Sequence, residues 1–147
     1  MTRRSNVVKR TSARRAPRPS AKGGAAELVR VRRHCLAIAG TIEKLSHGEP
    51  TFFTPKRVFA MFANDHHGDG HVAVWLPAGP GTQEALIEEA PDVYFRPPYV
   101  GVSGWVGVEV SGVDDEQLGA LIREAFALVS AKDRQSASTK SRRRTAK

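Results

Sequence analysis

Between residues 28 and 76, the apolar residues first recur at the spacing of a helix and then form short runs that are typical of strands. Leu28, Val31, Cys35 and Ile38 recur at helical spacing, and charged residues take the opposite side. Gly40 is placed to end this helix. Short β-branched or aromatic runs follow, separated by turn-forming residues, and they predict strands. These runs are Ile42–Leu45, Thr51–Thr54, Arg57–Ala63 and His71–Leu76.

The run at residues 57–63 is apolar on both sides. Alternation places Val58, Ala60 and Phe62 on one face of the strand, and the other face is equally apolar. A strand that buries both faces lies inside a sheet rather than at its edge, so we expect a central strand here.

Two more helices and two more strands complete the pattern. Residues 82–90 form the second helix, with Thr82 as N-cap, and short strands are expected at Tyr94–Phe95 and Trp105–Val110. Asp114, with Gln117 three residues later, is a capping-box pattern that opens the last helix. One apolar stripe then follows at Leu118, Leu121, Ile122, Ala125 and Val129.

This order of elements predicts an α+β domain. Short connections between consecutive strands favour an antiparallel meander, and the amphipathic helices are expected to pack on one face of that sheet. The domain is expected to span residues 25–131, with tails at residues 1–24 and 132–147 too poor in apolar side chains to fold, so both are predicted to be disordered.

Charge divides along the same boundaries. Residues 1–22 hold eight Lys or Arg and no acid, and residues 132–147 hold seven with a single acid, Asp133. The two ends therefore carry +14, whereas the whole chain carries +8 and the middle must be acidic. Only the ends have the electrostatics to bind a polyanion, and their lack of aromatic residues argues against base stacking or sequence reading.

Membrane and redox signals are absent from the sequence. No run approaches the eighteen apolar residues of a membrane-spanning helix, so no membrane association is expected. The N-terminal arginines are not followed by the apolar stretch of a secretory signal; an organellar transit segment is the less favoured alternative. Cys35 is alone, which excludes an internal disulfide.

Ligand-capable side chains gather at residues 65–71, in the sequence Asp-His-His-Gly-Asp-Gly-His, with His47 and Glu49 elsewhere in the chain. Their spacing matches no zinc, calcium or metalloprotease motif, and a polar, glycine-rich hairpin loop explains the composition equally well. No metal is therefore expected; the weak candidates for a metal site are His47, His66, His67 and His71.

Other patterns also have a structural explanation. His47 and Glu49 would suit an acid–base pair but lie in a good turn sequence. Trp75 and Trp105 are both interpreted as core rather than as a stacking platform. Arg96 with Tyr99 is interpreted as a structural turn rather than an anion site. No phosphate-binding loop or nucleophile elbow occurs, so no catalytic residue and no cofactor are predicted.

Five short segments carry a further pattern; they span residues 46–53, 57–60, 74–76, 94–101 and 104–108. In order and spacing, over roughly residues 26–131, they resemble the MmcQ/YjbR family. The resemblance implies a CyaY-like α+β fold in small, mostly bacterial cytoplasmic proteins. The family is commonly labelled DNA-binding by analogy to a double-wing arrangement of hairpins, and it implies no agreed catalytic residues.

The function expected from these observations is non-enzymatic, largely non-specific DNA binding through the basic ends, with the domain as scaffold. Two alternatives stay open: a small-molecule or metal-binding domain that uses the histidine-rich loop, and an adaptor whose ends contact acidic proteins. No oligomeric state follows from the patterns. The residues expected to contact nucleic acid are Arg3, Arg4, Lys9, Arg10, Arg14, Arg15, Arg18, Lys22, Lys56, Arg57, Lys140, Arg142, Arg143, Arg144 and Lys147.

Overall fold

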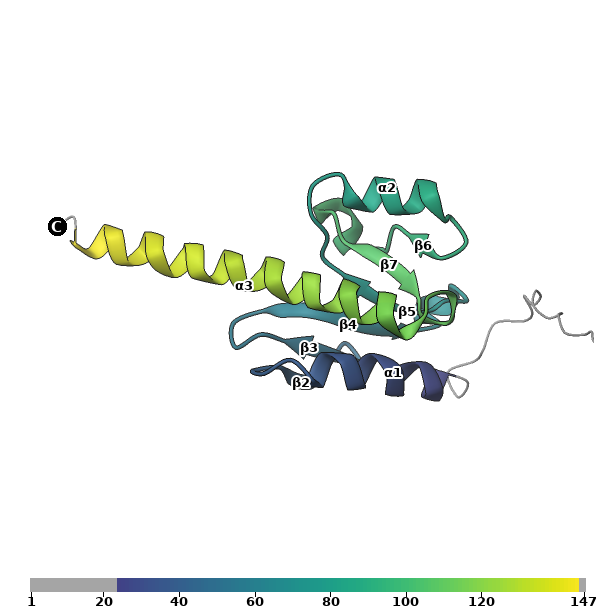
Figure 1. Cartoon of the computed structure of the whole chain (residues 1–147). Helices are drawn as coiled ribbons and strands as arrows, with labels where there is room; N and C mark the ends of the chain where they lie inside the picture. Colours follow the sequence, from purple (N-terminus) through teal and green to yellow (C-terminus); the bar gives the residue numbers. More distant parts are fainter. Residues whose placement is uncertain (1–23, 146–147) are drawn as a thin grey trace, which may run out of the picture.

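The structure, a computed structural model, describes the backbone of residues 24–145 and the side chains of residues 24–136. One sheet runs through the middle of the domain, and the helices lie against it (Figure 1). The main elements in chain order are α1 (Ala25–Leu36), β2 (Ile42–Ser46), β3 (Glu49–Phe53), β4 (Val58–Asn64), β5 (Val72–Leu76), α2 (Thr82–Glu89), β6 (Tyr94–Phe95), β7 (Val106–Glu109) and α3 (Asp115–Thr145). Short 3₁₀ turns at His66–Gly68, Val100–Ser103 and Val110–Gly112 complete the order.

The six strands are ordered β2-β3-β4-β5-β7-β6, and every neighbouring pair is antiparallel. The predicted meander is correct for β2 to β5 and wrong beyond them, because β7 pairs with β5 and β6 lies at the edge. All four residues of β7 are buried, whereas β6 has only two residues. A strand that is buried on both faces gains more from a central place than a two-residue strand does.

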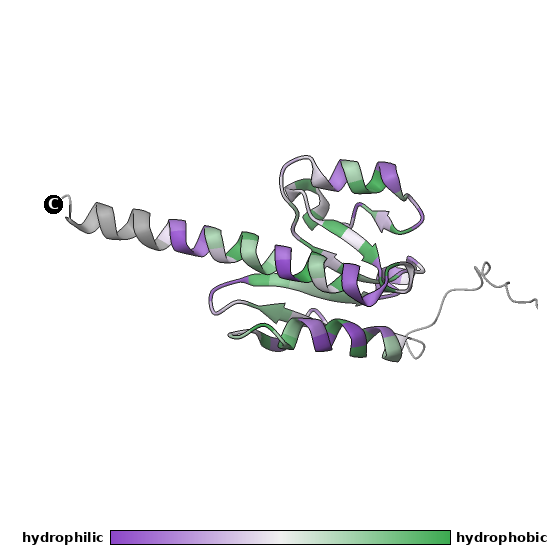
Figure 2. Cartoon of the chain, in the orientation of Figure 1, coloured by the Kyte–Doolittle hydropathy of each residue, from purple (hydrophilic) through white to green (hydrophobic). Residues whose placement is uncertain are grey.

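The helices pack on one face of the sheet, as the amphipathic pattern predicts. Val31 and Cys35 of α1 and Ile122 of α3 are fully buried with the sheet residues. Leu86 and Ile87 of α2 pack against the same core. The hydrophobic part of α3 lies where that helix crosses the sheet (Figure 2). The α+β class is therefore confirmed. Among the described residues no α-helix covers the opposite face of the sheet, which we call the helix-free face.

A β-bulge changes the side-chain directions at the start of β4. Phe52 pairs with Ala60 but Phe53 pairs with Val58, so Phe59 is the extra residue. Phe59 packs on Phe126 of α3, with ring centroids 5.0 Å apart and the rings nearly perpendicular. Val58 instead lines a pocket on the helix-free face. The predicted common face for Val58 and Ala60 is therefore wrong, because the extra residue reverses the alternation.

Helix α3 opens as half of a capping box. The Asp114 side chain accepts a hydrogen bond from the Gln117 backbone N–H at 2.8 Å. The Gln117 side chain does not return to Asp114; it donates to the Tyr94 hydroxyl at 2.6 Å and ties the helix start to β6. The predicted N-terminus is thus confirmed, with the second half of the box used for a tertiary contact.

The last helix is longer than the sequence pattern predicts. A tail was expected from residue 132, but α3 continues to Thr145 and projects past the sheet (Figure 1). Asp133 links α3 to the connection between β3 and β4. Its carboxylate accepts a hydrogen bond from the Thr54 hydroxyl at 3.0 Å and pairs with Arg57 at 2.7 Å. Extending an established helix is easier than starting one, and residues 132–145 contain no Gly or Pro to stop it. The predicted disorder at residues 1–24 falls, except for residue 24, outside the described residues.

Candidate functional site

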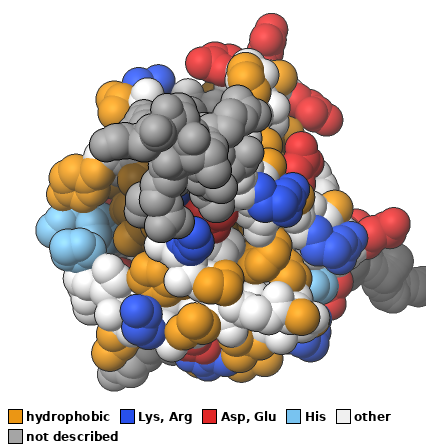
Figure 3. Space-filling view, turned by 90° about the vertical axis from the view of Figure 1, so that its left-hand side faces the viewer, with side chains coloured by type: hydrophobic (Ala, Val, Ile, Leu, Met, Phe, Trp, Pro, Cys, Tyr) orange, Lys and Arg blue, Asp and Glu red, His pale blue; other side chains and the backbone are white. Residues whose placement is uncertain are grey.

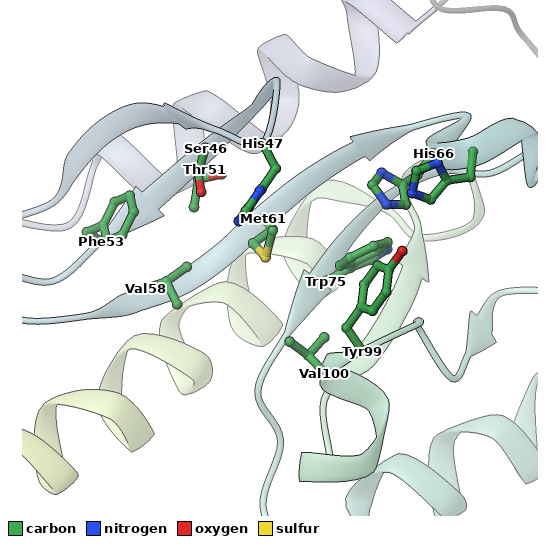
Figure 4. Close-up of a pocket in the computed structure, with 11 residues that line it drawn as sticks. Ser46, His47, Thr51, Phe53, Val58, Met61, His66, Trp75, Tyr99 and Val100 are labelled. Atoms are coloured by element: carbon green, nitrogen blue, oxygen red, sulfur yellow. The ribbon is translucent and has the colours of Figure 1, made fainter.

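The helix-free face of the sheet carries a pocket of about 550 Å³. Three connections surround it: the β2–β3 turn, the β4–β5 loop and the segment between β6 and β7 (Figure 4). Ser46, His47, Thr51, His66 and His67 supply polar atoms to its lining. The apolar part of the lining comes from Phe53, Val58, Met61, Trp75, Tyr99 and Val100.

Turn geometry places the rim histidines. His47 and Gly48 both have positive φ, 53° and 80°, which is the type I′ turn that joins β2 to β3 without splaying them. His67 also has a left-handed backbone, with φ 53°, within the 3₁₀ turn after β4. Non-glycine residues seldom adopt this conformation. These turns therefore fix the backbone position from which each of the two histidine side chains projects.

Tyr99 is held in an unusual backbone conformation at the pocket mouth. Its φ and ψ are 66° and −66°, and the Val100 N–H donates to the Pro98 carbonyl at 2.6 Å, which closes a γ-turn. The ring remains 69% exposed, and it lies 6.2 Å from the His66 ring and 6.5 Å from the His67 ring. Strain of this kind is retained where surrounding structure holds it, and it is common at ligand-binding sites.

Trp75 of β5 forms part of the pocket wall beneath the histidines. The residue is only 2% exposed, and its ring meets the His66 ring edge-on at 5.1 Å. Among the described residues, neither Trp75 Nε1 nor His66 Nε2 has a hydrogen-bond partner. A buried donor without an acceptor costs about 1–3 kcal/mol, so two of the residues that line the pocket each carry a buried nitrogen with no partner.

Glu49 lies behind His66, with its carboxylate 3.8 Å from His66 Nδ1. Burial raises the pKa of the Glu49 carboxyl above its ordinary value, although the Asn64 backbone N–H and the His66 side chain act against this rise. The folded protein therefore favours the protonated acid, and this contribution to stability is lost as the pH rises through the raised pKa.

Replacing Glu49 with glutamine should make the protein more stable than wild type at pH 7. The advantage should shrink at pH 4, where the wild-type carboxyl is increasingly protonated and the linkage contribution is restored. Thermal melts of both proteins at the two pH values measure the effect. A Tm difference that is the same at pH 4 and pH 7 would show that ionisation of Glu49 does not oppose folding.

His71 belongs to a separate neighbourhood. Its Nδ1 bonds to the carboxylate of Glu109, and its ring stacks on Phe95 with centroids 3.9 Å apart. A second hollow, of about 280 Å³, lies beside His71 and shares His66 and His67 with the first pocket. Across the side chains of residues 24–136, no three His, Cys, Asp or Glu are grouped to hold a metal ion. Of the four histidine candidates, His47 therefore lines only the first pocket and His71 only the second hollow, while His66 and His67 line both.

Residues 23–131, which we call the body, contain eight Lys and Arg, and four of these arginines pair with acids. Arg30 and Arg33 both pair with Asp115, at 2.9 and 2.6 Å, and Arg32 pairs with Glu43 at 2.7 Å. Figure 3 shows Lys and Arg dispersed among hydrophobic and acidic side chains on the face it presents. This part of the molecule therefore offers no concentrated basic surface in that view.

The predicted nucleic-acid contacts fall into two groups. Within the described part of the chain, Lys56 is exposed on the β3–β4 connection and Arg57 pairs with Asp133. The remaining ones have side chains outside the described residues; they are Arg3, Arg4, Lys9, Arg10, Arg14, Arg15, Arg18, Lys22, Lys140, Arg142, Arg143, Arg144 and Lys147.

The sequence patterns did not identify Gln83, which binds the segment between β6 and β7 at the edge of the pocket. Gln83 of α2 is buried and donates to the carbonyls of Gly101 and Trp105, while its own carbonyl accepts from Arg96 at 3.3 Å. Arg96 therefore has the structural role that its turn sequence suggested. A lone glutamine in a short amphipathic helix carries no periodic signal that distinguishes it from surface residues.

An antiparallel six-stranded sheet with helices on one face and a pocket on the other defines an α+β domain. The chain belongs to the YjbR family, whose model matches residues 36–128. Its fold is similar to the crystal structure of Deinococcus radiodurans protein DR2400, described as a DUF419 domain, with a TM-score of 0.59 and 24% identity over 70% of this chain and 78% of that one. No curated protein matches significantly in sequence. No described helix is long and apolar enough to span a membrane.

Proposed function

We propose that this protein is a non-enzymatic, largely non-specific DNA-binding protein whose basic ends contact phosphates while the YjbR domain serves as scaffold. The observation that carries the proposal is charge segregation. The two ends together hold +14, against +8 for the whole chain. Clustered Lys and Arg bind polyanions by releasing condensed counterions, and this requires no particular fold.

The body supports this division of labour. Its arginines at residues 30, 32 and 33 are committed to Asp115 and Glu43, which leaves them poorly placed to neutralise phosphates. Asp133, the only acid of residues 132–147, is likewise paired with Arg57. The extension of α3 beyond the sheet carries the C-terminal basic sequence away from the acidic body (Figure 1).

Salt dependence tests the proposal. The intact chain, titrated into a fluorescently labelled duplex, should lose affinity on a log–log plot with a slope of about −5 to −9, as expected for six to ten phosphate contacts. Unrelated duplex sequences should give the same slope. Affinity that is independent of salt, or confined to one sequence, would contradict backbone binding by the ends; no binding to any duplex would favour the adaptor alternative.

The body also has a ligand-sized pocket, which supports the small-molecule alternative as an additional activity rather than as a replacement. Polyanion binding uses the ends, whereas the pocket lies on the sheet, so the two proposals rest on different residues.

A further inference from the structure

We propose that the pocket on the helix-free face of the sheet binds a small aromatic carboxylate, with the ring against Trp75 and Tyr99 and the carboxylate at the buried nitrogens of Trp75 and His66. This site is independent of the basic ends. Its support comes from the size of the pocket, its apolar wall, its unsatisfied polar atoms and the kinds of charge around it.

Size and lining favour a compact, flat molecule. A volume of about 550 Å³ lies within the range of pockets that enclose small organic ligands. Met61 and Trp75 lie side by side on the paired strands β4 and β5, and Tyr99 lies next to Trp75, so Trp75 and Tyr99 offer flat rings to a ligand (Figure 4). Aromatic rings pack favourably on such surfaces in offset or edge-on arrangements.

The unpartnered nitrogens call for a ligand that carries a hydrogen-bond acceptor. Trp75 Nε1–H is a donor at every pH, it is buried, and among the described residues it has no acceptor. His66 Nε2 is similarly buried and unpartnered, on a ring 5.1 Å from that of Trp75. Both nitrogens lie just under the pocket surface, so a ligand carboxylate reaches them when the His66 ring shifts on binding. It then supplies the acceptor that Trp75 lacks, and it can also accept from His66 when that Nε2 carries a proton.

The lining residues favour an anion over a cation. Three histidines, His47, His66 and His67, line the pocket, whereas no Asp or Glu of the described residues does. Glu49 approaches His66 on the Nδ1 side, away from Nε2. An imidazole with an acidic neighbour at one nitrogen can present a proton at the other, as in carboxylate–histidine pairs of many binding sites. An amine in this pocket would find no carboxylate among its lining residues.

The rim is organised before any ligand arrives. His47, His67 and Tyr99 all have positive φ, and the Tyr99 turn is held by Gln83 through Gly101 and Trp105. Residues fixed in this way lose little further freedom on binding, which lowers the entropic cost of association. The strain at three of the residues that surround one pocket is consistent with a binding site.

The experiment uses the two tryptophans of the full-length chain. Selective ¹⁵N labelling gives two indole N–H signals, and loss of one signal in Trp75→Phe assigns them. Titration with 2-naphthoate should move the Trp75 signal saturably and leave Trp105 nearly unchanged, since Trp105 lies outside this pocket. 2-Naphthylmethylamine, which has the same rings and the opposite charge, should bind at least tenfold more weakly.

Two variants test the residues. Trp75→Phe keeps an aromatic wall but removes the donor, and His66→Leu removes the imidazole from a loop rather than from the sheet; each should weaken 2-naphthoate binding by at least about tenfold in calorimetry. Val102→Ala is the matched control, because Val102 is 79% exposed and does not line the pocket. Absence of a saturable Trp75 shift, equal affinity for the amine, or unchanged affinity in His66→Leu would overturn the proposal.

Discussion

Replacing the basic residues of both ends with glutamine is expected to lower DNA affinity at least about 100-fold at 100 mM salt, because each lost phosphate contact removes its share of counterion release. The changes affect the eight Lys and Arg of residues 1–22 together with Lys140, Arg142, Arg143, Arg144 and Lys147. The log–log salt slope should become correspondingly shallow. Anisotropy titrations of the full-length variant and wild type with the same duplex measure both quantities.

The control variant alters charge on the body instead. Lys44→Gln combined with Arg123→Gln removes two exposed or partly exposed basic residues of the folded domain. This change should alter affinity only a few-fold, as expected for weak long-range electrostatics screened by salt. If the control lost as much affinity as the variant with neutralised ends, the body rather than the ends would be the binding surface.

Replacing Phe59 with alanine is expected to destabilise the protein by about 3–5 kcal/mol, the range for truncating a buried phenylalanine. Phe59 is fully buried and meets Phe126 of α3 edge-on, so its loss leaves a cavity between sheet and helix. The bulge that turns Phe59 toward α3 also turns Val58 toward the pocket. The packing of Phe59 in the core and the position of Val58 in the pocket therefore depend on the same bulge.

Urea unfolding of Phe59→Ala measures this loss. Val102→Ala serves as the control, since truncation of an exposed side chain typically changes stability by no more than about 0.5 kcal/mol. A destabilisation below about 1 kcal/mol for Phe59→Ala would mean that the ring is not packed between β4 and α3 as the structure has it.

The helices and strands were predictable because their signals are local. The stripe of α3 and the two-sided apolar run of β4 follow directly from periods of 3.6 and 2. The order of β6 and β7 was not predictable in this way, because strand order depends on which segments bury both faces together. The bulge at Phe59 was missed because one extra residue leaves the sequence alternation unchanged while it reverses the side chains.

The extent of α3 shows a different limit. Low hydrophobicity after residue 131 predicted an unfolded tail, yet a helix can continue on propensity once it has started. The decisive contact, Asp133 with Arg57 and Thr54, joins positions far apart in sequence. A single acid among basic residues gave no indication of that partner.

The pocket was only partly visible in the sequence. The histidines at residues 47, 66 and 67 were identified as ligand-capable, and the structure brings them to one rim. Trp75 was correctly expected to be buried, but its unpartnered nitrogen depends on how three separate connections meet above the sheet. The spacing of residues along the sequence does not show how separate loops pack together.

The most direct test of the central claim is a map of the residues that contact DNA. Amide spectra of the full-length, isotope-labelled protein should be recorded while unlabelled duplex is added at low salt. Our account predicts that the largest changes occur within residues 1–22 and 132–147, with small changes in the sheet. Changes concentrated in the strand hairpins, with both ends unaffected, would contradict it.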